Sequence, residues 1–410
     1  MSETSDLERA LVDDWTNDWD LHGEQWAPNA ISIWNELRDT CPVAFTERYG
    51  RAHMPVTMEG VTQVARDTES FSSAWVTVAA PGNPRGASAP PITSDPPDHQ
   101  AHRRLLLPWF NPKKIAEMES GLRDFCRGLI KQIEGEQTAD AAERYAQHIP
   151  VHGICALTGV PESDADMFRD WIHRSLVVGP QDREVATVVL REMTGYIDAI
   201  LRDRLETPRD DMLTFLATAD IDGEPLEWLD RCGYVRLLVL AGIDTTWSAI
   251  GSGIWHFAQN PDQAAQLIDA DDDDMLWQTA IEEVLRYYAP VTMARKVTVD
   301  TEVAGCPVHA GDSMLLPFPA ANHDPESFEQ PGEFRIDRAK NRHLAFGLGI
   351  HRCVGSNLAR LELTVALQEW LRAFPGYSLD SANETTWAPG QIRGPRQLPV
   401  LLTPNAKAAV

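Results

Sequence analysis

Apolar residues recur at helical spacing through long stretches of this chain, and this periodicity constrains the fold more than any other feature. It predicts helices over residues 112–134, 162–176, 184–204, 227–260 and 353–374. Short β segments are expected near residues 51–58, 295–299 and 311–316. A stretch rich in Pro, Gly and Ser predicts an irregular loop over residues 81–98. The sequence therefore predicts a mainly α fold with small β-sheets.

Composition and charge narrow the class of protein. The chain has 410 residues, 43% of them hydrophobic, which is enough to bury a large core around a bulky ligand. Its formal net charge of −25 disfavours binding to nucleic acid or to anionic lipid. No run of eighteen apolar residues occurs, and the polar, acidic N-terminus lacks the pattern of a signal peptide. We therefore expect a cytoplasmic protein with no membrane partner, built as one domain over residues 1–410 with a loosely ordered extension over residues 1–25.

The six cysteines are far apart and include no CxxC pair, so reduced thiols are expected. Cys353 differs from the others because it lies in FGLGIHRCVG, residues 346–355, where three glycines let the backbone approach another group closely. The helix predicted to follow would place Cys353 at a helix N-terminus, which lowers the pKa of a thiol. A lone cysteine beside an apolar helix is usually a core residue. From this loop alone, a structural thiol and a metal ligand both remain open.

Three other segments carry polar residues in regular patterns. In LLVLAGIDTTWSAIG, residues 237–251, Gly, Asp and Thr interrupt an apolar helix, and the Thr245 hydroxyl could simply bond back to the Ala241 carbonyl. In EEVLRYYAP, residues 282–290, Glu283 and Arg286 stand three apart, as in many surface ion pairs. In HQAHR, residues 99–103, a histidine and an arginine stand four apart. Each pattern has an ordinary structural explanation when it is taken alone.

Taken together, these segments resemble the motifs of the cytochrome P-450 superfamily, in the same order and spacing over roughly residues 30–400. The loop matches the family signature FGxGxHxCxG at six positions: Phe346, Gly347, Gly349, His351, Cys353 and Gly355. The resemblance implies that the Cys353 thiolate is the axial ligand of a haem iron. It implies the cytochrome P-450 fold, with haem b between the distal helix that contains residues 237–251 and the proximal cysteine loop with its following helix.

The resemblance also implies roles for individual residues. Asp244 and Thr245 match the family's acid–alcohol pair and would deliver protons to bound oxygen. Glu283, Arg286 and Arg338 would form a buried network that braces the cysteine loop. Residues at family positions that contact the haem or its propionates are His99, Arg103, Ala241, Arg295, His343, Phe346, Gly347, His351, Cys353 and Gly355.

The activity implied is that of a bacterial, soluble, class I haem-thiolate monooxygenase, which inserts one oxygen atom of O2 into a C–H bond by hydroxylation or oxidative O-demethylation. The haem domain uses the whole chain, so electrons from NAD(P)H would arrive through a separate reductase and a ferredoxin of the 2Fe–2S type. We expect an acidic ferredoxin to bind a basic patch near the cysteine loop. The patch comprises Arg103, Arg104, Lys113, Lys114, Arg342, Arg352 and Arg360.

The substrate is less constrained by the sequence. Pocket residues expected from the resemblance are apolar: Val76, Val78, Leu237, Leu238, Val291 and Met293. No arginine in residues 237–245 or 291–294 would anchor a carboxylate, although Arg85 in the loop is an exception. We therefore expect a small to medium apolar substrate. Two alternatives stay open, a peroxide-dependent haem enzyme and a non-catalytic haem-binding sensor, and the Asp244–Thr245 pair favours neither.

Overall fold

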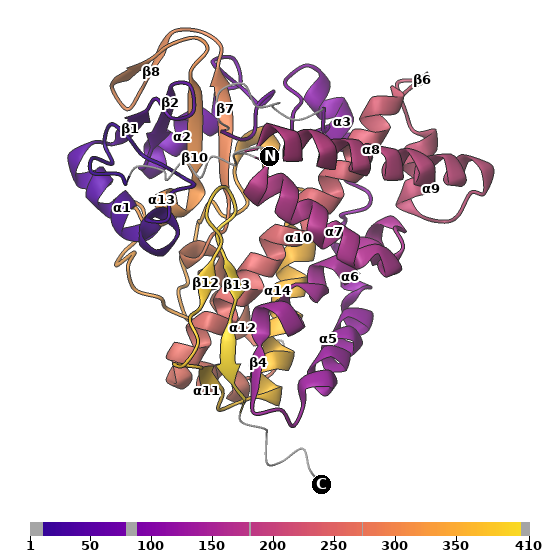
Figure 1. Cartoon of the computed structure of the whole chain (residues 1–410), viewed down its shortest axis with the longest axis vertical. Helices are drawn as coiled ribbons and strands as arrows, with labels where there is room; N and C mark the ends of the chain where they lie inside the picture. The colour runs from indigo at the N-terminus through magenta and orange to yellow at the C-terminus, as the bar shows by residue number, and fades with distance from the viewer. Residues whose placement is uncertain (1–10, 79–87, 180–181, 273, 403–410) are drawn as a thin grey trace, which may run out of the picture.

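The computed structural model describes residues 11–78, 88–179, 182–272 and 274–402 (Figure 1). The α-helices are α1 (Trp26–Thr40), α2 (Met58–Arg66), α3 (Asp98–Leu106), α4 (Pro112–Ala116), α5 (Glu119–Ile133), α6 (His148–Thr158), α7 (Ala165–His173), α8 (Arg183–Glu206), α9 (Met212–Thr218), α10 (Trp228–Gln259), α11 (Pro261–Asp269), α12 (Met275–Tyr287), α13 (Phe318–Asn322) and α14 (Ser356–Ala373). Tighter or wider helical turns are η1 (Ala142–Ala146), η2 (Glu162–Asp164), η3 (Arg174–Val178) and η4 (Gly349–His351).

The strands are short: β1 (Val43–Thr46), β2 (Ala52–Pro55), β3 (Phe71–Ser72), β4 (Thr138–Asp140), β5 (Asp220–Ile221), β6 (Glu224–Pro225), β7 (Thr292–Val297), β8 (Thr301–Val303), β9 (Cys306–Val308), β10 (Ser313–Pro317), β11 (Ser378–Leu379), β12 (Thr386–Trp387), β13 (Pro395–Gln397) and β14 (Pro399–Leu401). The predicted mainly α architecture with small sheets is therefore confirmed.

The helices predicted from periodicity are present, with changes at their ends. The segment predicted over 112–134 is divided into α4 and α5, and the one over 162–176 starts as a 3-10 turn and finishes in the π-helical turn η3. Asp182 and Asp274 begin α8 and α12 because their carboxylates accept hydrogen bonds from backbone N–H groups of the first turn. The helix expected from Cys353 starts only at Ser356. Cys353 therefore lies in the loop before the helix.

A five-stranded sheet joins the N-terminal strands to strands from the second half of the chain, in the order β1–β2–β10–β7–β3. Figure 1 shows it as the indigo and orange part of the molecule, beside the helical part. β2 and β10 are parallel, and the other neighbours are antiparallel. Side chains alternate along a strand, so Met293 and Arg295 of β7 point to the same face. Both of these side chains line the large cavity.

Helix α10 runs through the helical part and packs against α6, α8 and α14 (Figure 1). Glycines allow the close approach: a Cβ on Gly253 would lie 2.8 Å from Leu367 Cδ1 of α14, and one on Gly242 would overlap Ile154 of α6. Among the described residues, α10 is long and apolar enough to cross a membrane, but 67% of the apolar window is buried inside the protein. This burial is that of a core helix.

The N-terminal segment differs from the expectation. Residues 11–25 were predicted to be loosely ordered, yet Trp19 and Leu21 are buried in a cluster with α1, and the Arg48 Nε donates to Asp18 Oδ1 at 2.6 Å. Burying two large apolar side chains opposes fraying of this segment. Residues 1–10 lie outside the described part of the chain.

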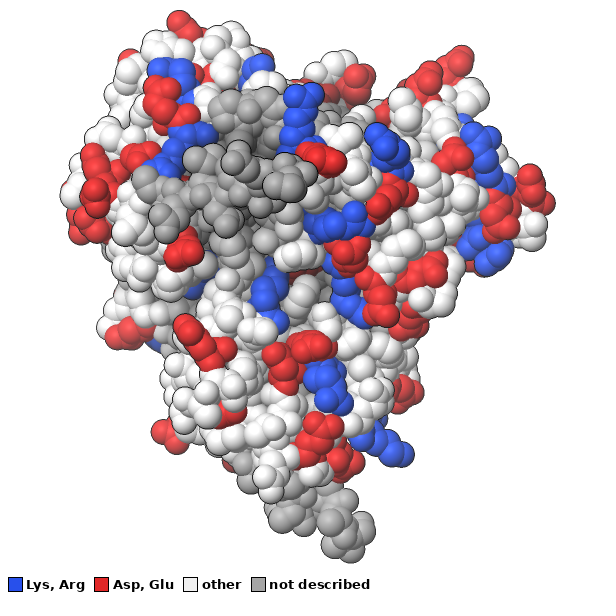
Figure 2. Space-filling model, viewed as in Figure 1, with Lys and Arg blue, Asp and Glu red and all other residues white. Residues whose placement is uncertain are grey.

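Charge on the surface is mixed. Figure 2 shows acidic and basic side chains interspersed on the face it presents, with no continuous basic patch among the described residues there.

Candidate active site

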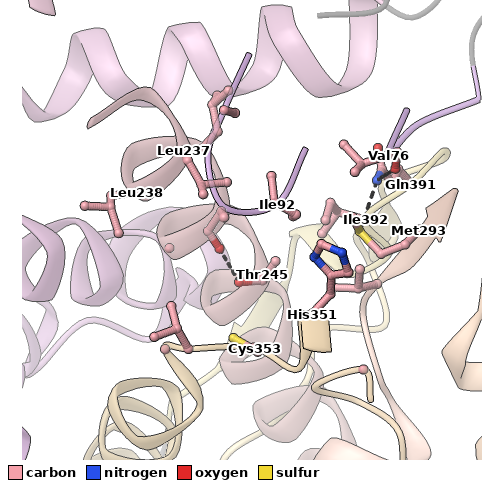
Figure 3. A pocket seen from close by; sticks show the side chains of 18 of the residues that line it. Val76, Ile92, Leu237, Leu238, Thr245, Met293, His351, Cys353, Gln391 and Ile392 are labelled. Atoms are coloured by element: carbon pink, nitrogen blue, oxygen red, sulfur yellow. Dashed lines mark hydrogen bonds between the residues drawn. The ribbon is translucent and has the colours of Figure 1, made fainter. Parts of the chain in front are cut away.

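A cavity of about 450 Å³ lies between α10 and the loop that precedes α14. Its other walls come from residues 89–93, η3, α8, β7 and residues 391–392. Figure 3 shows Thr245 of α10 above Cys353 of the loop. A volume of this size is in the range of small-molecule sites. Thr245 and Cys353, which the sequence predicts to be at the site, therefore line the same cavity.

The backbone of the cysteine loop is shaped by its glycines. Gly347 and Gly349 have φ values of 63° and 69°, in the left-handed region that favours glycine. A Cβ on Gly349 would lie only 2.9 Å from the Ala65 carbonyl oxygen, so the loop packs directly on the end of α2. The Cys353 N–H donates to the Phe346 carbonyl at 2.8 Å, which closes the loop. The thiol is thus held at the cavity wall by backbone geometry.

The groups around Cys353 shift the pKa of its thiol in opposite directions. Burial raises the pKa of the Cys353 thiol, while the Gly355 N–H and the cations Arg103, Arg352 and Arg360 lower it. The net direction is upward, so the lowering expected from a helix N-terminus is wrong for the protein alone. The reason is burial, which outweighs the Gly355 N–H and the nearby cations. A cation bound to the sulfur would favour the thiolate.

A cluster of basic groups lies at one side of the cavity: His99, Arg103, Arg295 and His351. The imidazole rings of His99 and His351 are 4.4 Å apart, and Arg103 Nη2 donates to the Arg352 carbonyl at 2.6 Å. Burial lowers the pKa of Arg295 to about 10, and burial together with the neighbouring cations lowers the pKa of His351 to about 3. Asp95 acts in the opposite direction on Arg295, but it offsets the effect of burial only in part.

Helix α10 presents Ala241 and Thr245 to the cavity. The Thr245 hydroxyl donates to the Ala241 carbonyl at 2.8 Å, as expected for a threonine in an ordinary helix. Asp244 points elsewhere: it is buried, and its Oδ1 lies 2.8 Å from Arg396 Nη2 of β13. Burial raises the pKa of Asp244, and Arg396 partly offsets this. The structure therefore places Thr245, but not Asp244, against the cavity.

Comparisons with known proteins identify the family. A family model described as Cytochrome P450 matches residues 183–376. The cytochrome P450 monooxygenase PikC of Streptomyces venezuelae is 34% identical over 316 residues, or 75% of each chain. A methyl-branched lipid omega-hydroxylase of Mycobacterium tuberculosis is 31% identical over 389 residues, or 90% of this chain and 89% of the relative. A solved structure of a P450 EryK mutant in complex with erythromycin B has a TM-score of 0.83 and 30% identity, over 93% of this chain and 98% of that one.

The chain belongs to the cytochrome P450 family. Members of the family are haem enzymes that use O2, and this chain is a cytochrome P450 monooxygenase. Its residues fit a haem. The Cys353 thiol lines the cavity, where it can bind iron. His99 Nε2 is buried without a hydrogen-bond partner, and Arg295 has no ion-pair partner among the described residues, which suits the two carboxylates of haem.

Not every residue expected at the haem lines the cavity. Phe346, Gly347, His351 and Gly355 do line it, but His343 does not. The His343 Nε2 instead lies 3.0 Å from Glu282 Oε2. Arg360 donates to both oxygens of the same carboxylate, and these partners lower the pKa of Glu282 to about 2. His343 therefore binds a carboxylate of the chain itself and does not line the cavity.

The predicted network of Glu283, Arg286 and Arg338 is brought together under the cysteine loop. Arg286 Nη2 lies 2.8 Å from Glu283 Oε1, and Arg338 Nε lies 3.0 Å from Glu283 Oε2. Arg286 also donates to the carbonyl of Asn322, the last residue of α13, and to the Pro331 and Glu333 carbonyls of the coil that follows. Glu283 and Arg286 are completely buried, as the resemblance implied and unlike the surface pair that the spacing alone would allow.

The substrate side of the cavity contains most of the predicted apolar residues. Val76, Leu237, Leu238 and Met293 line it (Figure 3). Val291 lines it as well. Val78 does not line the cavity, because its side chain packs in the N-terminal core cluster with α1. Arg85 lies outside the described residues.

Among the cavity residues that the sequence did not indicate are Gln391 and Arg236. Gln391 Nε2 donates to the Val76 carbonyl at 3.0 Å and lies 3.5 Å from Met293 Sδ (Figure 3). Nothing in the local sequence around it signals a pocket. Arg236 also lines the cavity, one residue before the apolar stretch that begins at Leu237. An arginine directly before an apolar helical stretch is the signal that the sequence offers for it.

Proposed function

We propose that this P450 inserts one oxygen atom of O2 into a C–H bond of a small to medium, largely apolar substrate, by hydroxylation or oxidative O-demethylation. The observation that supports this most is that Thr245 and Cys353 line one cavity whose remaining walls are mostly apolar. The net reaction consumes O2, two electrons and two protons, and yields the oxygenated product and water. The protein must therefore position the substrate, deliver protons and admit electrons.

The residues have distinct parts in this proposal. When haem is bound, Cys353 would hold its iron through the sulfur, Arg103 and Arg295 would pair with the haem carboxylates, and the uncharged rings of His99 and His351 would donate hydrogen bonds to them. The bound haem supplies the site where O2 is held and reduced. Apolar walls exclude bulk water from that site, which limits unproductive reduction of oxygen.

Thr245 supplies a hydroxyl at the cavity wall, half exposed there and bonded to Ala241. A hydroxyl in this position can donate a proton into the cavity and be reprotonated by water. Asp244 acts on the other side of α10, where its pair with Arg396 joins α10 to β13. We assign direct proton donation to Thr245. Asp244 instead holds α10 in place through its ion pair with Arg396.

Replacing Thr245 with alanine is expected to uncouple the reaction. Removing the hydroxyl should lower the product formed per O2 consumed by about 10²-fold, the lower end of the effect of a positioned proton donor, and the lost oxygen should appear as hydrogen peroxide. The measurement is the ratio of product to NAD(P)H oxidised in a reconstituted system. Thr245→Ser keeps the hydroxyl and should retain most of the coupling. Equal coupling in all three proteins would remove Thr245 from the proton path.

Electrons are proposed to enter from a ferredoxin that docks near the cysteine loop. Of the predicted patch, Arg104, Lys113, Arg342 and Arg352 are exposed, and none is in an ion pair with a described carboxylate. The other three members of the patch have contacts within the protein. Arg103 lines the cavity, and Arg360 forms an ion pair with Glu282. Lys114 Nζ lies 3.6 Å from the centre of the Trp109 ring. The exposed apolar side chains Leu107 and Ile350 lie next to these cations in sequence. A mixed basic and apolar surface suits transient docking of an acidic protein.

Charge reversal at Arg104 and Arg352 is expected to slow reduction by an acidic ferredoxin. The double variant Arg104→Glu, Arg352→Glu should lower the second-order rate constant by at least about tenfold at low salt, because steering depends on these charges. Stopped-flow reduction of the ferric protein measures this rate. The control is Arg191→Glu on α8, an exposed position on the opposite side of the cavity. An unchanged rate in the double variant would move the docking site elsewhere.

The proposed activity is tested by turnover with labelled oxygen. A reaction with a ferredoxin, its reductase, NAD(P)H and ¹⁸O2 should yield product that contains one ¹⁸O atom. Turnover with hydrogen peroxide alone, and none with O2 and electrons, would support the peroxide-dependent alternative instead. We also place the enzyme in the cytoplasm, where its six free cysteines would stay reduced.

A further inference from the structure

Helix α10 carries a buried arginine in the wall of the substrate cavity. Arg236 is 6% exposed and lines the cavity together with Leu237, Leu240 and Val189. Its position is nine residues before Thr245, which corresponds to about 13 Å along the helix axis. The cationic group and the proton donor therefore mark two separated regions of the same cavity.

The contacts of Arg236 use little of its hydrogen-bonding capacity. Its Nη2 donates to the Ser88 carbonyl, while the Ser88 hydroxyl is bonded to Asp230. Gly233 permits this approach, since a Cβ there would lie 2.5 Å from Ser88 O and 2.9 Å from Pro90 Cδ. A guanidinium has five N–H donors in a planar fork. No carboxylate among the described residues forms an ion pair with Arg236, and burial lowers its pKa.

A buried cation without an acidic partner is costly, and native proteins keep such groups paired. A clamp on one loop carbonyl requires a single donor, which an uncharged side chain could supply. Arg236 lines a cavity that is otherwise apolar in this region, and its hydrogen bond to the Ser88 carbonyl uses only Nη2. The group that would satisfy the other donors is a planar anion, because a carboxylate matches the fork with two parallel hydrogen bonds.

We propose that Arg236 binds a carboxylate of the substrate, and that the substrate class is apolar carboxylic acids. This inference rests on the proposed function and refines it. With the carboxylate held at Arg236, the acid extends through the apolar part of the cavity toward Thr245 and Cys353. Oxidation then occurs at a carbon remote from the carboxylate, and carbons next to the carboxylate are protected.

The test compares carboxylic acids with their neutral primary amides in the haem-loaded ferric protein. The probes are the straight-chain acids from octanoate to tetradecanoate and a series of 4-alkylbenzoates, each paired with its amide. Binding is followed by the spin-state shift in the absorption spectrum at neutral pH. At least one acid should bind about ten- to hundredfold more tightly than its amide, the effect of a charge-assisted hydrogen bond. Acids that bind no better than their amides, or that give no shift at all, would overturn the inference.

Variants show whether Arg236 causes the preference for acids over amides. Arg236→Gln retains a donor for the Ser88 carbonyl and removes the charge, so acid affinity should fall to that of the amide while amide affinity stays the same. Arg191→Gln, an exposed position on α8 outside the cavity lining, should leave both unchanged. If Arg236→Gln keeps the preference for acids, Arg236 is only a loop clamp. The comparison of acid with amide in the wild-type protein needs no variant, so a folding defect cannot obscure the result.

The outcome is separable from the proposed function. Failure of the proposed function appears as the absence of thiolate-ligated haem or of oxygen-dependent turnover in the wild-type protein. Failure of the carboxylate inference leaves both of these intact and removes only the difference between acids and amides. Products from a bound acid add a further check, since oxidation next to the carboxylate would contradict the position assigned to it.

Discussion

Replacing Glu283 with glutamine should destabilise the protein by about 3–5 kcal/mol, the range found when one partner of a buried ion pair is removed. The Glu283 side chain is completely buried and accepts hydrogen bonds from Arg286, Arg338, the Arg335 N–H and Asn341. Its neutralisation would leave two buried guanidinium groups without a counter-charge. The cysteine loop and the coil beneath it would lose their common anchor, so haem content should fall together with stability.

Urea unfolding of the purified protein measures this loss, with haem content recorded on the same samples. The matched control is Glu326→Gln, an exposed position in the same coil, which should change the free energy of unfolding by less than about 0.5 kcal/mol. Bonds from the arginines lower the pKa of Glu283 below its ordinary 4.5, although burial raises it. Its charge therefore stabilises the fold above about pH 4.5, and the difference between wild type and Glu283→Gln should shrink as pH falls below that value. A variant as stable as the wild type at pH 7 would contradict the structural role of this network.

Replacing Cys353 with alanine should reduce oxygen-dependent product formation to background and change the ferric absorption spectrum. The Cys353 sulfur lines the cavity and is the proposed iron ligand, and a thiolate ligand favours cleavage of the O–O bond. Alanine is close in size and the loop is held by backbone contacts, so the fold should persist, as circular dichroism can verify. Cys155→Ala and Cys232→Ala are matched controls, because both thiols are buried away from the cavity lining. Wild-type turnover in Cys353→Ala would exclude it as the ligand.

Much of the fold could be predicted because helical periodicity is local information. The long apolar stripe of α10 and the polar interruption at Asp244 and Thr245 are both visible in the sequence. Burial is not local, so the segment around Trp19 was taken for a loose extension although distant packing orders it. The start of α14 was placed too early for a related reason. The Cys353 N–H bonds to Phe346 rather than continuing a helix, and spacing alone does not reveal that contact.

The site could be predicted where a motif fixes both the residue and its backbone, as in the cysteine loop. The prediction was wrong where the partner of a side chain is remote in sequence. His343 binds Glu282, sixty-one residues earlier, and Asp244 binds Arg396 on β13. Val78 follows a cavity residue by two positions, yet it turns into the N-terminal core because the segment is not a regular strand. Such pairings depend on the folded structure, and a single sequence does not encode them as a pattern.

The central claim is that Cys353 ligates haem as a thiolate in a monooxygenase. The most direct measurement is the absorption spectrum of the wild-type, haem-loaded protein after reduction and saturation with carbon monoxide. We predict the strongly red-shifted band that is characteristic of thiolate ligation. A spectrum typical of histidine ligation, or no carbon monoxide-dependent band in haem-replete protein, would contradict the account.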